Sequence, residues 1–141
     1  MSTKQTIIVA NTGHRPKTKE DYAVNSPLNL AIAKKLREHL LSHLQTGKKV
    51  HAISGMAQGS DTLYALVALK LKKQGYDIIL ECAIPCENHS AKWPAAAQKQ
   101  WQDIVDQADI VTYVTRSPYF AYLMQIRNEY MVKKAHEVVA V

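Results

Sequence analysis

The 141-residue sequence is poor in the residues that mark several large classes of protein. Its two cysteines exclude a small domain held together by a network of disulfides. No apolar run approaches the roughly 20 residues that a membrane-spanning helix needs. The N-terminus also lacks the apolar centre of a signal peptide. We therefore expect a cytoplasmic protein that makes no contact with a membrane.

Acidic residues are fewer than basic ones, 12 against 18, and the formal net charge is +6. A positive charge permits anionic partners, nucleic acid among them. The lysines, however, fall mostly on the polar faces of predicted helices, and no arginine-rich run or basic stripe with interleaved aromatics is present. Nucleic acid is therefore a lesser alternative among the partners.

The two cysteines belong to a Cys-x-x-x-Cys-x-x-His pattern formed by Cys82, Cys86 and His89. A closed zinc site has four ligands, so this pattern is one ligand short. We expect no bound metal and no cofactor.

Apolar, β-branched runs alternate with segments of helical periodicity along the whole chain. This alternation predicts a single three-layer α/β domain over 1–141, with a mostly parallel sheet of about five strands and helices on both faces. The Ser26-Pro27 pair is typical of a helix start. The predicted strands are 6–10, 50–54, 77–84, 109–115 and 137–141, and the predicted helices are 28–44, a second one ending at about 74, 95–107 and 122–136.

Loops with unusual residues follow three of the predicted strands directly, at 13–16, 54–57 and 85–93. The carboxyl ends of parallel strands meet at one edge of a sheet, and ligands of such folds bind outside that edge. We therefore expect these loops to line one ligand site.

The segment 54–61 reads Ser-Gly-Met-Ala-Gln-Gly-Ser-Asp, between an apolar strand and an apolar-periodic helix. Glycines let a ligand approach the backbone, and the start of a helix offers unpaired N–H groups to an anion such as phosphate. A plain turn between strand and helix is the alternative, because the spacing of the glycines is loose.

The run Thr12-Gly13-His14-Arg15-Pro16, followed by the segment 54–61, resembles the YpsA-like branch of the SLOG superfamily. That superfamily is Rossmann-like and includes the DNA-processing protein DprA and the LOG phosphoribohydrolases. The resemblance implies a pocket for a nucleotide or a nucleotide-derived ligand, but not one particular reaction. Further matches are Pro85, Trp93, Ala108-Asp109, Ser117-Pro118-Tyr119, Arg127-Asn128 and Met131-Val132.

One departure from the family pattern concerns the segment after the fifth strand. Related proteins continue there into a glycine-rich loop, and LOG-type enzymes use a Pro-Gly-Gly-x-Gly-Thr-x-x-Glu segment for phosphate binding and catalysis. This sequence ends at Val141 without such a segment. The chain is therefore either a natural short form or a fragment.

The expected ligand-binding residues come from all of these motifs. They are Gly13, His14, Arg15, Pro16, Ser54, Gly55, Met56, Ala57, Gly59, Asp61, Pro85, Trp93, Arg127 and Asn128. Arg15 is the main candidate for charge recognition, because a guanidinium binds phosphate through two hydrogen bonds. Asp61 contacts a ribose or stabilises the first turn of its helix, and Trp93 stacks on a base or anchors its loop to the core. Arg127 snorkels, pairs with a buried carboxylate or contacts the ligand.

The leading hypothesis is a binding module that senses, carries or sequesters a nucleotide derivative. The second is a hydrolase of nucleotide N-glycosidic bonds, which needs an acid or base at the pocket. Its candidates are Glu81, Glu87, Asp61 and His14. The third is DprA-like binding of single-stranded DNA. The sequence leaves open the ligand, the catalytic residues, the pathway and whether the chain forms a homo-oligomer.

Overall fold

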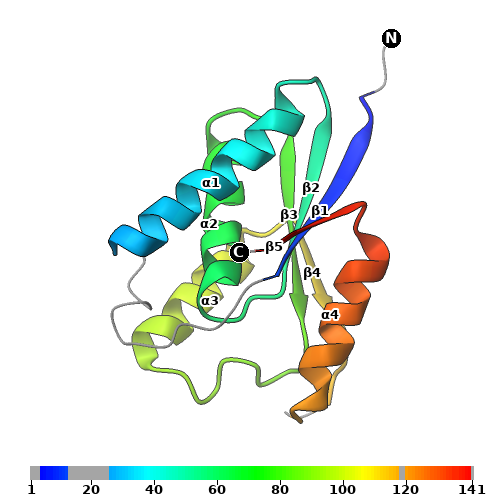
Figure 1. Cartoon of the computed structure of the whole chain (residues 1–141). Coiled ribbons are helices and arrows are strands. Elements are labelled where there is room, and N and C mark those ends of the chain that lie inside the picture. Colours follow the sequence, from blue (N-terminus) through cyan, green and yellow to red (C-terminus); the bar gives the residue numbers. More distant parts are fainter. Residues whose placement is uncertain (1–3, 13–25, 118–119, 141) are drawn as a thin grey trace.

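The computed structural model describes residues 4–12, 26–117 and 120–140. Strands and helices alternate along the described chain (Figure 1). In chain order they are β1 (Thr6–Thr12), α1 (Pro27–Leu44), β2 (Lys49–Ser54), α2 (Ser60–Lys73), β3 (Ile78–Ile84), α3 (Ala95–Gln107), β4 (Ile110–Tyr113), α4 (Tyr122–Lys134) and β5 (Glu137–Ala140).

The strands form one parallel sheet in the order β4-β3-β2-β1-β5. The first three connections step along the sheet in one direction, so right-handed crossovers place α1, α2 and α3 on the same face. The connection from β4 to β5 returns across the sheet, so α4 lies on the other face (Figure 1). The predicted three-layer α/β fold is therefore confirmed.

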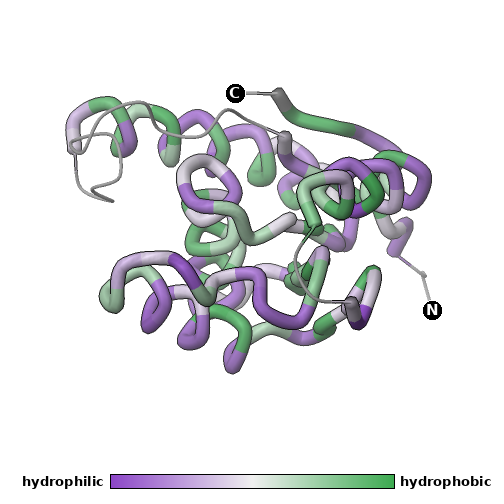
Figure 2. The backbone as a smooth tube through the Cα atoms, turned by 90° about the horizontal axis from the view of Figure 1, so that it is seen from below, coloured by the Kyte–Doolittle hydropathy of each residue, from purple (hydrophilic) through white to green (hydrophobic). Residues whose placement is uncertain are grey.

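The two faces of the sheet are covered very unequally. The larger core lies under α1, α2 and α3, and Leu36, Leu71 and Leu80 are among its buried members. The core under α4 has four buried residues among those described, Ala10, Ile53, Ala83 and Met131. In Figure 2 hydrophobic and hydrophilic residues alternate around the helical turns, as expected for helices that pack one face against a sheet.

A local cap sets the start of α1, whereas a contact with β1 accompanies the end of α4. The side chain of Ser26 caps α1 by accepting a hydrogen bond from the Asn29 amide (3.2 Å), and Pro27 opens the helix as predicted. The helix α4 ends at Lys134 and not at 136, because Ala135 is already extended and the Nδ1 atom of His136 accepts the Ile8 amide (2.8 Å). This bond helps to align the chain with β1 as β5 begins.

None of the described helices is both long and apolar enough to cross a membrane.

Candidate functional site

The turn between β2 and α2 is held by its own side chains. The hydroxyl of Ser54 donates to the carbonyl of Asp61 (2.8 Å) and accepts from the amide of Met56 (3.2 Å). The carboxylate of Asp61 accepts the amide of Ala57 (3.3 Å), and the hydroxyl of Thr62 donates to the Ala57 carbonyl (3.0 Å). Met56 is fully buried with a φ of 61°, a conformation that is uncommon for a residue other than glycine. These hydrogen bonds fix the conformation of the turn, which we call the braced turn (54–61).

These bonds reduce the number of backbone amides that a ligand can use. The amides of Met56 and Ala57 bond to Ser54 and Asp61 inside the protein. At the start of α2, the amides of Gln58, Gly59 and Ser60 have no acceptor within the described part of the chain. An anion at this edge would therefore bind at the beginning of the helix, where the positive end of its dipole lies.

Asp61 is part of this bracing. Its side chain is buried and also accepts a hydrogen bond from the Nδ2 atom of Asn11 (3.0 Å) at the end of β1. Burial raises the pKa of the Asp61 carboxyl, although the nearby Arg127 guanidinium and the bonds from Ala57 and Asn11 act in the opposite direction. The geometry supports the structural reading of Asp61, in which the carboxylate ties β1 to the start of α2.

Arg127 reaches the same edge from the opposite face of the sheet. Its side chain is buried, its Nη1 atom donates to the carbonyl of Gly55, and its Nε atom donates to the Asn128 side chain (2.7 Å). A Cβ atom on Gly55 would lie 2.8 Å from the guanidinium carbon. A side chain at position 55 would therefore displace the guanidinium, and no positive φ restricts this position.

Pro85 and Trp93 lie on the third loop of this edge. Pro85 is buried directly after β3, and its carbonyl accepts the hydroxyl of Thr115 (3.0 Å). Trp93 is half-buried, packs against the larger core, and contacts the His89 ring edge-on, with centroids 5.1 Å apart. This geometry favours the reading of Trp93 as an anchor for its loop.

Two of the acid–base candidates, Glu81 and Glu87, lie in different surroundings. Glu81 lies in the middle of β3, where its fully buried carboxylate faces α4 and accepts bonds from four side chains. Those bonds outweigh the effect of burial, so the pKa of Glu81 lies well below its usual value. Glu87 is exposed and pairs with Arg116 (3.2 Å). Neither arrangement resembles a general acid poised at a pocket.

The remaining predicted residues, Gly13, His14, Arg15 and Pro16, lie outside the described part of the chain, as does Tyr119. Their segment follows Thr12, which pairs with Ala140 at the carboxyl ends of β1 and β5.

Sequence analysis missed Asn11. This side chain is fully buried and donates to Asp61 and, at 3.4 Å, to Ser60. Its Oδ1 atom has no hydrogen-bond partner among the described residues. The available signal was a polar residue directly after the apolar run of the first strand.

Residues of the kinds that bind metal ions cluster at a different place from the one considered in the sequence. Among the described residues, Cys82, Cys86 and His89 do not form a group that could hold an ion, whereas His39, His43 and Glu137 do. Burial, and next the charge of Glu81, raises the pKa of the Cys82 thiol to about 12, which opposes thiolate formation.

The parallel sheet, with its braced turn at the carboxyl edge, places the protein among the three-layer Rossmann-like α/β proteins. The model of the YspA SLOG family matches residues 9–141, and the chain belongs to that family. The resemblance seen in the sequence is thus confirmed.

The chain is also similar to three bacterial proteins. The chain is 30% identical over 105 residues to UPF0398 protein BH1768 of Halalkalibacterium halodurans, covering 74% of this chain and 55% of that protein. It is 34% identical over 91 residues to UPF0398 protein BBR47_29830 of Brevibacillus brevis, covering 64% and 48%. It is 31% identical over 88 residues to UPF0398 protein lin2003 of Listeria innocua, covering 62% and 48%. The chain therefore spans about half the length of these relatives.

Proposed function

We propose that the carboxyl edge of the sheet binds a nucleotide or a nucleotide-derived ligand, and that the protein senses, carries or sequesters it. The observation that carries the proposal is the convergence of three elements at this edge. Asn11 comes from β1, the braced turn from the β2–α2 connection, and Arg127 from α4 on the opposite face. The family of the chain supports a nucleotide as the class of ligand.

Different groups at this edge suit the phosphate and the ribose of such a ligand. The amides of Gln58 to Ser60, at the positive end of α2, suit a phosphate. The Asp61 carboxylate would repel a phosphate placed against it, whereas the Oδ1 atom of Asn11 can accept a hydrogen bond from a sugar hydroxyl. We expect the phosphate near the start of α2 and the Arg15 segment, with the ribose toward Asn11.

The proposal is tested by thermal shift and calorimetry with mononucleotides, NAD and ADP-ribose, with inorganic phosphate and a single-stranded oligonucleotide as comparison arms. Arg15→Ala should abolish the shift given by the best nucleotide. Lys17→Ala removes the same charge from the same segment and should leave most of the shift. Equal loss in both variants, or a response to the oligonucleotide alone, would contradict a specific nucleotide pocket.

Hydrolysis of an N-glycosidic bond is the second candidate, and the raised pKa of Asp61 is the observation in its favour. A buried carboxyl that holds a proton more strongly than usual is a feature of general acids. Free base released from nucleoside monophosphates, and lost in Asp61→Asn with nucleotide binding retained, would support catalysis. Binding without release of base supports the module alone.

A further inference from the structure

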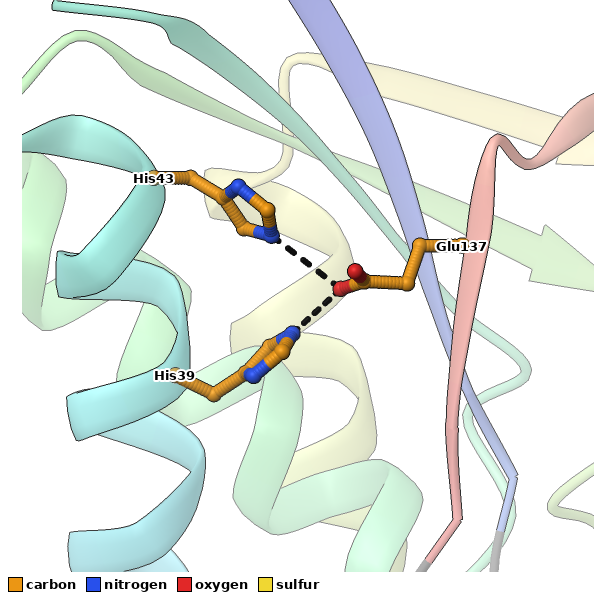
Figure 3. Close-up of side chains that lie close together, drawn as sticks. All are labelled: His39, His43 and Glu137. Carbon is orange, nitrogen blue, oxygen red and sulfur yellow. Dashed lines mark hydrogen bonds and ion pairs between the residues drawn. The ribbon is translucent and has the colours of Figure 1, made fainter. Parts of the chain in front are cut away.

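Three side chains meet between α1 and β5 (Figure 3). His39 and His43 lie one turn apart on α1, and both point their Nε2 atoms at Oε1 of Glu137, the first residue of β5. The His43 contact is 3.1 Å, and the His39 contact is closer. Two imidazoles and a carboxylate thus converge on one point.

The fold places this cluster at the amino end of β5, beside the last turns of α1. α1 leads from the end of β1 to the beginning of β2, so its last turns lie near the amino edge of the sheet. Residues four positions apart share one face of a helix, which turns both histidines toward β5. Glu137 opens β5 beside Val9 of β1. The proposed nucleotide site lies at the carboxyl ends of the strands, and the cluster shares no residue with it.

We propose that His39, His43 and Glu137 bind a divalent first-row transition-metal ion, with Zn²⁺ as the best match. Imidazole nitrogens favour Zn²⁺, Cu²⁺, Ni²⁺ and Co²⁺, whereas Mg²⁺ and Ca²⁺ favour all-oxygen sites. Two histidines with one carboxylate form a known three-ligand set for zinc that leaves a fourth position for water.

The distances between the ligand atoms suit such an ion. The three atoms all lie within 4.8 Å of one another. Donors at about 2.0–2.2 Å from a tetrahedral ion stand roughly 3.4 Å apart. The 3.1 Å separation between His43 Nε2 and Glu137 Oε1 is near that value. Small side-chain rotations would therefore open the cluster enough to admit the ion.

The protons and the surroundings also permit binding. Without a metal, each Nε2–H donates to the carboxylate; with a metal, each imidazole keeps its proton on Nδ1 and turns the Nε2 lone pair toward the ion. The side chains of His39 and Glu137 are 37% and 35% exposed, and that of His43 is 15% exposed. Solvent can thus supply both the ion and its fourth ligand. A bound ion would tie the edge strand β5 to α1.

The experiment uses tag-free protein freed of metal with a chelator, because a polyhistidine tag would compete for the ion. Competition against a chromophoric chelator should show one equivalent of Zn²⁺ bound, and Co²⁺ should give the intense visible bands of a low-coordinate site. At a free Zn²⁺ concentration of about 100 times Kd, the midpoint of thermal unfolding should rise by about 5–10 °C.

Variants decide whether these three residues hold the ion. His43→Asn and Glu137→Gln should each weaken Zn²⁺ binding at least tenfold. Glu137→Gln keeps a carbonyl oxygen that can still accept hydrogen bonds from the two imidazoles, so it preserves that contact if the fold needs it. Glu38→Gln removes the same charge from an exposed position on α1 and should bind as the parent does. Binding unchanged in both His43→Asn and Glu137→Gln, or no stoichiometric binding of Zn²⁺, Co²⁺ or Ni²⁺, would overturn the proposal.

Discussion

Replacing Glu81 should destabilise the chain more than replacing any exposed carboxylate. Oε1 of Glu81 accepts from His51 Nε2 (2.7 Å) and Lys134 Nζ (2.8 Å). Oε2 accepts from the Thr112 hydroxyl (2.8 Å) and the Tyr130 hydroxyl (2.6 Å). Because the carboxylate is fully buried between the sheet and α4, its removal leaves buried donors without their acceptor.

The expected size of the effect follows from what each substitution leaves behind. Glu81→Leu removes every acceptor at once and should lower the free energy of unfolding by about 3–5 kcal/mol, the usual cost of breaking a buried charged network. Glu81→Gln should lower the free energy of unfolding by only about 2 kcal/mol. The amide keeps one acceptor oxygen, and the two hydroxyls can rotate to accept hydrogen bonds from its NH₂ group. Lys134→Met should cost about 1 kcal/mol, since the lysine is 34% exposed and solvent screens its charge.

Urea unfolding followed by circular dichroism measures these differences, with Glu129→Gln as the exposed control on α4. The double variant Glu81→Leu/Lys134→Met should lose less unfolding free energy than the two single variants together, because the lysine has already lost its partner in Glu81→Leu. A Glu81→Leu protein within about 0.5 kcal/mol of the parent would refute the reasoning.

Three further predictions use single sites. The folded-state pKa of Glu81 lies below its ordinary value of 4.5, so the stabilisation from its carboxylate is present above about pH 4.5 and is lost as the pH falls below that value. The difference in unfolding free energy between the parent and Glu81→Gln should therefore shrink in acid. A difference that stays constant would count against the network. Gly55→Ala should displace the Arg127 guanidinium and cost about 1–2 kcal/mol, whereas an unchanged urea midpoint would show that the arginine moves freely. Burial and the Glu81 charge raise the pKa of Cys82 to about 12, so a thiol reagent should modify it only in urea, and rapid reaction of the native protein would contradict its burial.

The secondary structure could be predicted because its signals are local. Apolar runs mark the strands, and Ser26 with Pro27 marks the start of α1. The alternation of elements also predicted the parallel sheet. It could not predict that one helix alone covers the second face, since this depends on where β5 joins the sheet.

The contacts of the candidate site could not be predicted in the same way. The space beside Gly55 is filled by Arg127, which lies 72 positions further along the chain. The sequence contained His39 and His43 at a spacing that favours a shared ligand, but their partner Glu137 is 94 positions beyond the nearer of them. Such pairs depend on strand order and register rather than on any local pattern.

The most direct test of the central claim is backbone amide NMR during titration with the nucleotide that gives the largest thermal shift. We predict that the amides of Gln58, Gly59 and Ser60 show the largest shifts, with saturation at one equivalent. The turns at Gly47 and Gly75, at the amino edge of the sheet, should not respond. Shifts that concentrate at the amino edge, or no saturable shift at the start of α2, would contradict the account.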